Sequence, residues 1–360
     1  MAKAPKVPGL TRVPAARWGM AEWYGRDITT LTDEERQNRG LLASEQMATG
    51  DLSNTLPCPF MSNLTPNARC SKKGGVCSIR KFSPPGLETP VAPTDDKIVT
   101  TCPARFIQDV EEGKSVFVWV AEKMLDINAP IIVRETPFLR TVSECQIPMA
   151  GEGDPATAED VREEIAAEKR AGRIDWILVK PETLSDSDDL GWCAVETQAL
   201  YFSGRRRKLE FDRYAEAPGP VLFPVENRRP DYRSSGPKRL SPQLDVKVPV
   251  LINWGKKLAV VIDRFFFENM NRLEESYARA RDDRARRDNA EVVWFVLDYD
   301  EQLRLRTGEV HYTTLVSSRK ALNATEPLDK VEFTQQLIGV INNPRRTNKV
   351  FRTSSPATPE

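Results

Sequence analysis

Four runs of β-branched and aromatic residues, separated by turn residues, constrain the fold of this chain more than any other feature. Val, Ile, Trp, Tyr and Phe favour pleated, half-buried backbone, so these runs predict strands. The strands are expected at residues 115–120, 130–133, 174–179 and 191–202. A charged helix is expected at 158–171, between the second and third strands. Strands that alternate with helices indicate an α/β core.

Further elements are expected on both sides of this region. An acidic first turn suits the positive end of a helix dipole and predicts a helix through residues 32–36. An apolar stripe that includes Leu258 and Phe266 predicts a helix over about 250–280. The other expected elements are an extended loop region at 204–246, strands at 291–299 and 309–315, and a helix at 328–341.

The length of 360 residues is enough for two domains of ordinary size. Residues 57–105 hold four of the six cysteines and lack the apolar periodicity of a core, so something else must order them. We therefore expect a helical or irregular segment at 1–56 and a cysteine module at 57–105. A core with its loops is expected at 106–345, and a disordered tail at 346–360.

The single histidine, His311, excludes many catalytic schemes. A Ser-His-Asp triad, an HExxH zinc site or a His-x-Glu deaminase site would each depend on this one residue, which has no partner motif. Catalysis is therefore expected to use carboxylates and a metal ion. Lys and Arg total 52 and Asp and Glu total 52, so attraction to a polyanion must come from local clusters of charge.

The sequence also indicates a cellular context. It contains no apolar run of transmembrane length, and its basic N-terminus lacks the apolar region of a secretory signal. A cytoplasmic protein without a membrane partner is expected. In a reducing compartment, cysteines are more often metal ligands or buried thiols than disulfides.

Cys58, Cys70, Cys77 and Cys102 offer a complete set of tetrahedral ligands for iron or zinc. A metal ion would also order a segment that has no core. The spacing differs from the tight CxxC pairs of zinc fingers, and four unrelated buried thiols are an equal alternative on chemistry alone. Ligand identity does not separate iron from zinc. Cys193, inside an expected strand, is interpreted as a small core residue.

Asp175, Glu196 and Gln198 form a second group. Glu196 and Gln198 share one face of their strand, and a hairpin through 182–190 would bring Asp175 beside them. Two carboxylates that converge can bind magnesium, which activates water and stabilises charge on a phosphodiester. An Asp on one strand and Glu-x-Lys on the next is the layout of the PD-(D/E)xK nuclease core, with Gln in place of Lys here. Solvated acids at strand ends are the alternative.

Basic residues cluster after this group. In a chain with no net charge, such clusters suit contacts with phosphates, and arginine can also bind the edges of guanine bases. The simpler interpretation is that these charges are only solvated. The candidate DNA-binding residues are Arg205, Arg206, Arg207, Lys208, Arg228 and Arg229.

Taken in order, these residues resemble the NotI-type restriction endonucleases. The similarity covers roughly residues 18–340, and the order of a four-cysteine site followed by Asp and Glu-x-Gln is its specific part. The matching segments are Cys58-Pro59-Phe60, Cys70, Gly75-Val76-Cys77, Cys102-Pro103, Ile174-Asp175-Trp176, Glu196-Thr197-Gln198 and Phe202-Ser203-Gly204.

The resemblance implies a PD-(D/E)xK core, an α/β fold in which helices flank a mixed sheet, with an N-terminal four-cysteine module that holds one iron. It implies a homodimer that requires magnesium, with Asp175 and Glu196 as the magnesium ligands and Gln198 in the place of the usual lysine. The family also uses an upstream glutamate. Glu135 is our choice, and Glu164 or Glu168 could compete.

The expected function is that of a type II restriction endonuclease, which hydrolyses phosphodiester bonds of double-stranded DNA at a specific site. Such an enzyme belongs to a restriction-modification defence system, in which a cognate DNA methyltransferase is a possible partner. Whether one accompanies this protein lies outside its sequence. The alternative is a metal-stabilised, sequence-specific DNA-binding protein without nuclease activity. A redox role is disfavoured because the chain lacks the paired CxxC motifs of rubredoxin-like sites.

Overall fold

A computed structural model describes the chain with gaps. The described residues are 15–86, 90–94, 97–111, 114–139, 172–185, 190–202, 207–225, 228–275, 282–323 and 328–343. They divide into a large unit, up to Asn323, and a small C-terminal unit. The helix expected at 158–171 and the tail expected at 346–360 lie outside the described residues. No helix in the described part is long and apolar enough to span a membrane.

A six-stranded mixed sheet, called the central sheet below, forms the middle of the large unit. Its strand order is β15-β14-β13-β10-β9-β8, and β13 runs parallel to both β10 and β14 while the other pairs are antiparallel. Every residue of β13 is buried, as is typical of a strand covered on both faces. The strands are β8 (Ile131–Pro137), β9 (Arg173–Val179), β10 (Trp192–Thr197), β13 (Leu258–Asp263), β14 (Val292–Tyr299) and β15 (Leu305–Thr313).

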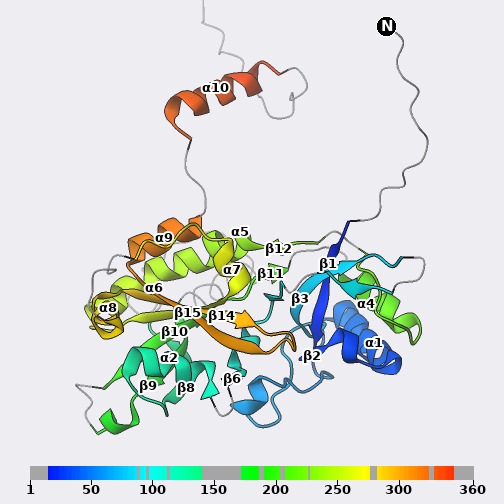
Figure 1. Cartoon of the computed structure of the whole chain (residues 1–360), viewed down its shortest axis with the longest axis horizontal. Helices are drawn as coiled ribbons and strands as arrows, with labels where there is room; N and C mark the ends of the chain where they lie inside the picture. Colours follow the sequence, from blue (N-terminus) through cyan, green and yellow to red (C-terminus); the bar gives the residue numbers. More distant parts are fainter. Residues whose placement is uncertain are drawn as a thin grey trace, which may run out of the picture. The chain divides into compact units, whose positions relative to one another are not determined.

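Helices flank the central sheet. In Figure 1, α2 lies on one side of it, and α6, α7 and α9 lie on the other. This arrangement confirms the mixed α/β class expected from the sequence. The flanking helices are α2 (Val116–Leu125), α6 (Ser241–Asn253), α7 (Arg264–Glu268), α8 (Asp283–Asn289) and α9 (Leu315–Asn323).

A five-stranded antiparallel sheet, called the N-terminal sheet, combines two strands that precede the cysteine-rich region with three strands inside it. Its order is β2-β1-β3-β4, with β5 also paired to β3. Its core includes Ile79 and Phe82, which are buried, so the segment around the cysteines shares a packed core with the N-terminal residues. The strands are β1 (Arg17–Trp23), β2 (Arg26–Asp27), β3 (Val76–Ser83), β4 (Ala92–Pro93) and β5 (Val99–Thr100).

Helices α1 (Asp33–Thr49) and α4 (Arg207–Glu216) pack together beside this sheet. A capping box between Thr32 and Glu35 begins α1, and Gly50 ends it in the left-handed conformation. Gly40 lets the two helices approach closely, because a Cβ there would lie 2.7 Å from backbone atoms of α4.

A buried ion pair joins the N-terminal sheet to the central sheet. Arg105 donates to Glu22 of β1 at 2.8 Å, and its guanidinium also donates to the carbonyl of Leu303, just before β15. Its other face packs over the ring of Tyr299 at the end of β14. The side chains of Arg105 and Glu22 are 1% and 4% exposed, so both charges are compensated inside the protein.

Short elements complete the large unit. The strands are β6 (Asp109–Glu111), β7 (Lys114–Ser115), β11 (Tyr201–Phe202) and β12 (Pro230–Asp231). The short helices are α5 (Tyr232–Ser235), a π-helix (Gly236–Leu240) and 3-10 turns at Ile28–Thr30, Met61–Asn63, Pro103–Ile107 and Pro181–Thr183.

The C-terminal unit contains one described helix, α10 (Lys330–Ile341). Asp329 caps it by accepting from the N–H of Glu332. None of its residues is buried.

Most expected elements are confirmed with shifts of a few residues at their ends. The strands expected at 130–133, 174–179, 291–299 and 309–315 correspond to β8, β9, β14 and β15. The strand expected at 191–202 is β10 followed by the short β11. The helices expected at 32–36 and 328–341 correspond to α1 and α10.

Three expectations are wrong. Of residues 115–120, Ser115 caps helix α2 and the rest begin it. Its buried positions Val116, Val120 and Met124 have helical spacing once the run is followed past Val120. The helix expected over 250–280 is instead the end of α6, strand β13 and α7, because a fully buried strand lacks the alternation that identifies strands. The region 204–246, expected as a loop, holds α4, α5, the π-helix and the start of α6.

Candidate active site

The structure brings Asp175 and Glu196 together on adjacent strands. The register of β9 and β10 pairs Val195 with Trp176, so Glu196 follows opposite Asp175. The backbone N–H of Asp175 donates to Oε1 of Glu196 at 3.2 Å. The N–H of Thr197 donates in return to Oδ2 of Asp175 at 3.2 Å. Each acid is therefore held by the backbone of the neighbouring strand.

Burial makes this pair electrostatically unusual. Glu196 is only 2% exposed, and burial, followed by the nearby charge of Asp175, raises its pKa to about 8. Burial also raises the pKa of Asp175, while the charge of Lys247 and the donors of Thr197 act in the opposite direction. Two carboxyl groups whose charged forms are disfavoured by burial would be stabilised by a cation between them.

Glu135 lies on the edge strand β8, next to Asp175. The register pairs Arg134 with Trp176 and Thr136 with Ile174, which puts Glu135 opposite Asp175. Its side chain is half exposed and forms ion pairs with Arg134 at 2.7 Å and Arg173 at 3.5 Å. Its φ is +50°, in the left-handed region that a residue with a side chain rarely adopts. The competing candidates Glu164 and Glu168 lie outside the described residues.

Gln198 follows β10 directly. Its N–H donates to the carbonyl of Val261 at 3.0 Å, and its side-chain Nε2 donates to the carbonyl of Ala199 at 2.6 Å. Among the described residues, its amide makes no hydrogen bond to Asp175 or Glu196. The structure thus places Gln198 one position beyond the strand, with its amide directed to the neighbouring main chain.

A cleft of about 410 Å³ opens in front of Asp175, and Glu196 is buried behind its lining residues. Glu135, Asp175 and Thr197 line one side, together with Arg134 and Trp176. The opposite side comes from the cysteine-rich region and consists of Met61, Thr65, Ala68, Arg69, Ser71, Cys102, Pro103, Ala104 and Ile107. This cleft therefore lies between the central sheet and the segment that carries the cysteines.

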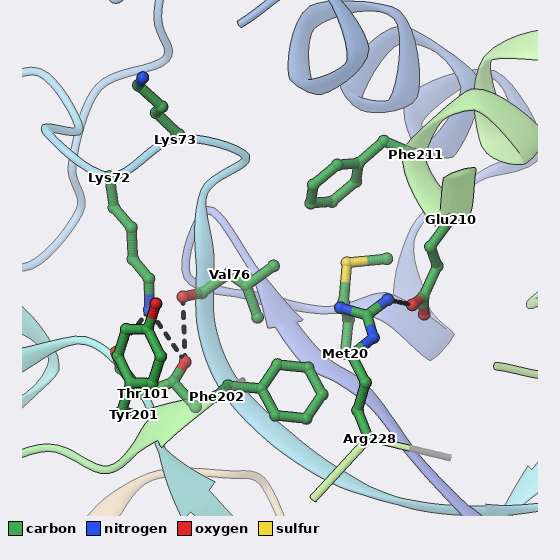
Figure 2. A pocket seen from close by; sticks show the side chains of 10 residues that line it. All are labelled: Met20, Lys72, Lys73, Val76, Thr101, Tyr201, Phe202, Glu210, Phe211 and Arg228. Atoms are coloured by element: carbon green, nitrogen blue, oxygen red, sulfur yellow. Dashed lines mark hydrogen bonds and ion pairs between the residues drawn. The ribbon is translucent and has the colours of Figure 1, made fainter. Parts of the chain in front are cut away.

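A smaller cavity of about 70 Å³ lies elsewhere in the large unit, between β1, β3, β11 and α4. Figure 2 shows that two of its charged side chains are bound within the lining, Lys72 to Thr101 and Arg228 to Glu210. Asp175 and Glu196 do not line it. The larger cleft is therefore the better candidate for a reaction site.

The four predicted metal ligands lie in one neighbourhood. Cys58, Cys70 and Cys77 are buried and Cys102 is half-buried. Burial, reinforced by the charges of Cys102 and Cys58, raises the pKa of the Cys70 thiol to about 11. Burial and the charge of Cys102 likewise raise the pKa of Cys77. The cysteines therefore affect one another electrostatically although they come from separate parts of the chain.

The metal site itself stays a prediction. In the described part of the chain, no three His, Cys, Asp or Glu side chains are arranged to hold a metal ion. The thiols of Cys70 and Cys77 instead donate to the carbonyls of Lys72 and Gly75, each at 3.6 Å. The donor chemistry fits a soft metal ion, and Cys58 already accepts the N–H of Met61 at 3.5 Å. Cys193 is buried in β10, as the sequence suggested.

The predicted DNA-binding residues differ in their surroundings. Arg205 and Arg206 lie outside the described residues, and Arg207 begins α4. Lys208 is exposed and pairs with Asp212 at 2.8 Å. Arg229 is exposed, whereas Arg228 is buried in its ion pair with Glu210 and over the ring of Phe202. The geometry thus favours an internal role for Arg228.

Sequence reasoning missed one charged residue at the site. Lys247 of α6 is 1% exposed, and its Nζ donates to Oε1 of Glu196 at 2.5 Å. The available signal was the position of this lysine between Leu244, Val248 and Leu251, on the apolar face of a helix. The sequence interpretation ends its loop region at 246 and begins a helix only at about 250, so it divides the apolar face of α6 and misses Lys247.

Comparison with known families agrees with this arrangement. A family model described as "Restriction endonuclease NotI" matches residues 42–312, which include the four cysteines, Asp175, Glu196 and Gln198. The match spans most of the chain, so the protein belongs to the NotI restriction endonuclease family. Members of such a family are nucleases that act on DNA. No curated protein matches the chain significantly.

Proposed function

We propose that this protein is a magnesium-dependent type II restriction endonuclease with a variant PD-(D/E)xK site. The observation that carries the proposal is the pairing of Asp175 with Glu196 on adjacent strands of the central sheet, beside the cleft, in a chain of the NotI family. The mixed sheet and its flanking helices support the proposed core. The protein would cut unmethylated DNA as part of a restriction-modification system, alongside a cognate methyltransferase.

The donor set suits a hard cation. Asp175 and Glu196 would hold magnesium through carboxylate oxygens, which this ion prefers. When bound, magnesium lowers the pKa of water and stabilises the charge that develops on a phosphodiester. Both contacts that fix Glu196 fall on Oε1, and in the described part of the chain no donor contacts Oε2.

The protein's own groups have distinct roles in this proposal. Thr197 fixes the carboxylate of Asp175, and the backbone of Asp175 fixes that of Glu196. Gln198 has no titratable proton and cannot act as a general base, so its amide would orient a water while a substrate phosphate accepts the proton. Glu135, across from Asp175, would complete the acidic row.

The cleft also suggests how DNA is held. The exposed Arg69 lies on its cysteine-rich side, and Arg134 lies on the other side, over the ring of Trp176. Arginines on both walls suit the phosphates of a DNA strand. The four cysteines would hold one structural iron or zinc ion, which would fix the position of the Arg69 wall.

A palindromic site requires two reaction centres related by a two-fold axis, because each strand is cut once. We therefore propose a homodimer. The competing function, a DNA-binding protein without nuclease activity, predicts binding without cleavage.

The test is Glu196→Gln, which keeps the size of the side chain and removes its charge. We expect this variant to bind DNA as the wild type does and to lose cleavage by a factor of at least roughly 10³, since a transition-state electrostatic interaction is lost. Glu182→Gln, at an exposed glutamate in the turn between β9 and β10, is the matched control. Full cleavage by Glu196→Gln would refute the assignment.

A further inference from the structure

The Glu-x-Gln motif contains no lysine, and Lys247 is a buried lysine at the same site. The Glu-x-Gln motif puts a neutral amide where a nuclease of this layout carries lysine, and the amide of Gln198 is bound to the carbonyl of Ala199. The ammonium at the site comes instead from α6, nearly fifty residues further along the chain.

The contacts of Lys247 are specific. Its Nζ donates to Oε1 of Glu196 at 2.5 Å and to Oε1 of Gln243 at 3.1 Å. Gln243 precedes it by four residues, so both lie on the same face of α6. The Lys247 and Glu196 side chains are 1% and 3% exposed, which means that neither charge is satisfied by water.

The fold fixes this placement. Leu244, Val248 and Leu251 are fully buried on the same face of α6, which packs against β13. Strand β13 pairs in parallel with β10 and places Val260 beside Glu196. The lysine therefore approaches Glu196 from the helical layer on the sheet. Its charge also reaches Asp175, where it opposes the rise in pKa that burial causes.

We propose that Lys247 is a positioning residue for Glu196 and replaces, from another element, the cation missing from the Glu-x-Gln motif. Lys247 and the backbone N–H of Asp175 hold the same oxygen, Oε1, and so fix the rotation of the carboxylate. Oε2 is then presented to a divalent cation. This inference rests on the proposed function, because it assigns Glu196 to a cation.

The test compares Lys247→Met with Lys257→Met. Methionine keeps an unbranched side chain as far as Cε and removes the ammonium. Lys257 is a suitable control because it is a partly buried lysine next to the same sheet, and its Nζ binds the carbonyls of Asp288 and Ala290. Binding of Mn²⁺ and Mg²⁺ without DNA is measured by calorimetry, and single-turnover cleavage is measured over a magnesium series.

We expect Lys247→Met to weaken divalent-cation binding roughly 10- to 100-fold and to lower cleavage by a similar factor, as for other residues that orient metal ligands. DNA affinity without metal and the behaviour of Lys257→Met should match the wild type. If Lys247→Met is folded and binds cations and cleaves like the wild type, Lys247 is merely structural and the inference is overturned.

If Lys247→Met does not fold, Gln243→Met tests the inference in its place. It removes the neighbour that orients the ammonium and leaves the charge pair in place. We expect it to weaken cation binding by a smaller factor, and unchanged binding would contradict the inference. If the wild type itself does not cut DNA, the proposed function fails, and the difference in cation affinity still decides the role of Lys247.

Discussion

The backbone N–H of Asp175 donates to the carboxylate of Glu196, a residue 21 positions later in the chain. One acid of the pair thus positions the carboxylate of the other through a main-chain N–H, whose place is set by the sheet. In the other direction, the backbone N–H of Thr197 donates to the carboxylate of Asp175. Because both donors are backbone N–H groups at the ends of paired strands, the sheet fixes the positions from which the two carboxylates are held.

Glu135 provides a test of strain at the site. Its φ of +50° costs on the order of 1 kcal/mol for a residue with a side chain, and glycine adopts this conformation freely. We expect Glu135→Gly to change the free energy of unfolding by less than about 1 kcal/mol, because relief of strain offsets the greater entropy of the unfolded chain. Chemical denaturation measures this change.

DNA cleavage assays distinguish the role of the Glu135 carboxylate from the effect of its backbone conformation. Both Glu135→Gly and Glu135→Gln should cut DNA at least roughly tenfold more slowly if the carboxylate takes part in the reaction. Normal cleavage by Glu135→Gln would remove Glu135 from the site and leave Glu164 and Glu168 as the candidates.

Arg228 and Arg229 are neighbours in sequence with opposite expected effects. Arg228→Met removes the ion-pair partner of the buried Glu210, and we expect it to lower the free energy of unfolding by about 3–5 kcal/mol. Arg229→Ala, at an exposed position, should leave stability unchanged and reduce the slope of log affinity against log salt by about one, as for a phosphate contact. An unchanged salt slope would exclude Arg229 from the DNA interface.

Two buried cysteines in strands test the metal site. Cys77 lies in β3 within the predicted set of ligands, and Cys193 lies in β10 outside it. We expect about one iron or zinc per chain in the wild type and in Cys193→Ala, and a loss of metal in Cys77→Ala that destabilises the fold by several kcal/mol. Elemental analysis and thermal unfolding of the three proteins decide the matter. Equal metal content in both variants would contradict the four-cysteine assignment.

Asp263 predicts a specific pH dependence of stability. Burial raises its pKa to about 6, against the opposing N–H donors of Phe266 and Thr100, while the unfolded value is near 3.8. Between these values the folded chain binds more protons than the unfolded chain. The contribution of this carboxyl group is therefore complete below about pH 4 and is lost as the pH rises through about 6.

Asp263→Asn removes the titration and keeps a side chain that can cap α7. We expect the free energy of unfolding of the wild type, relative to this variant, to fall by up to about 3 kcal/mol between pH 4 and 6. Urea unfolding across this range measures the difference. Parallel curves for the two proteins would show that Asp263 does not carry the effect.

The pairing of Asp175 with Glu196 could be predicted because the residues that determine it lie close together in the sequence. Alternating strands on either side of a polar turn fix the register of a hairpin, and register determines which side chains meet. Lys247 could not be predicted in the same way, since its partner lies on another element and only the packing of α6 on β13 connects them. The burial of Arg228 could not be predicted either, because a run of basic residues does not show which one faces the core.

Burial in the core accounts for two of the three errors in secondary structure. Strand β13 has no polar face, so its apolar residues match a helical stripe as well as a strand. Helix α2 begins with β-branched residues that favour strands, and its burial in the core overrides that preference. In both cases tertiary packing, which a local pattern does not contain, decides the structure.

Cleavage of unmethylated phage DNA by the purified wild-type protein, with magnesium and with EDTA, tests the central claim directly. Our account predicts discrete fragments with magnesium and intact DNA with EDTA, and the fragment ends would give the recognition sequence. Intact DNA under both conditions, from folded protein that binds the same DNA, would contradict the account and indicate a binding protein without nuclease activity.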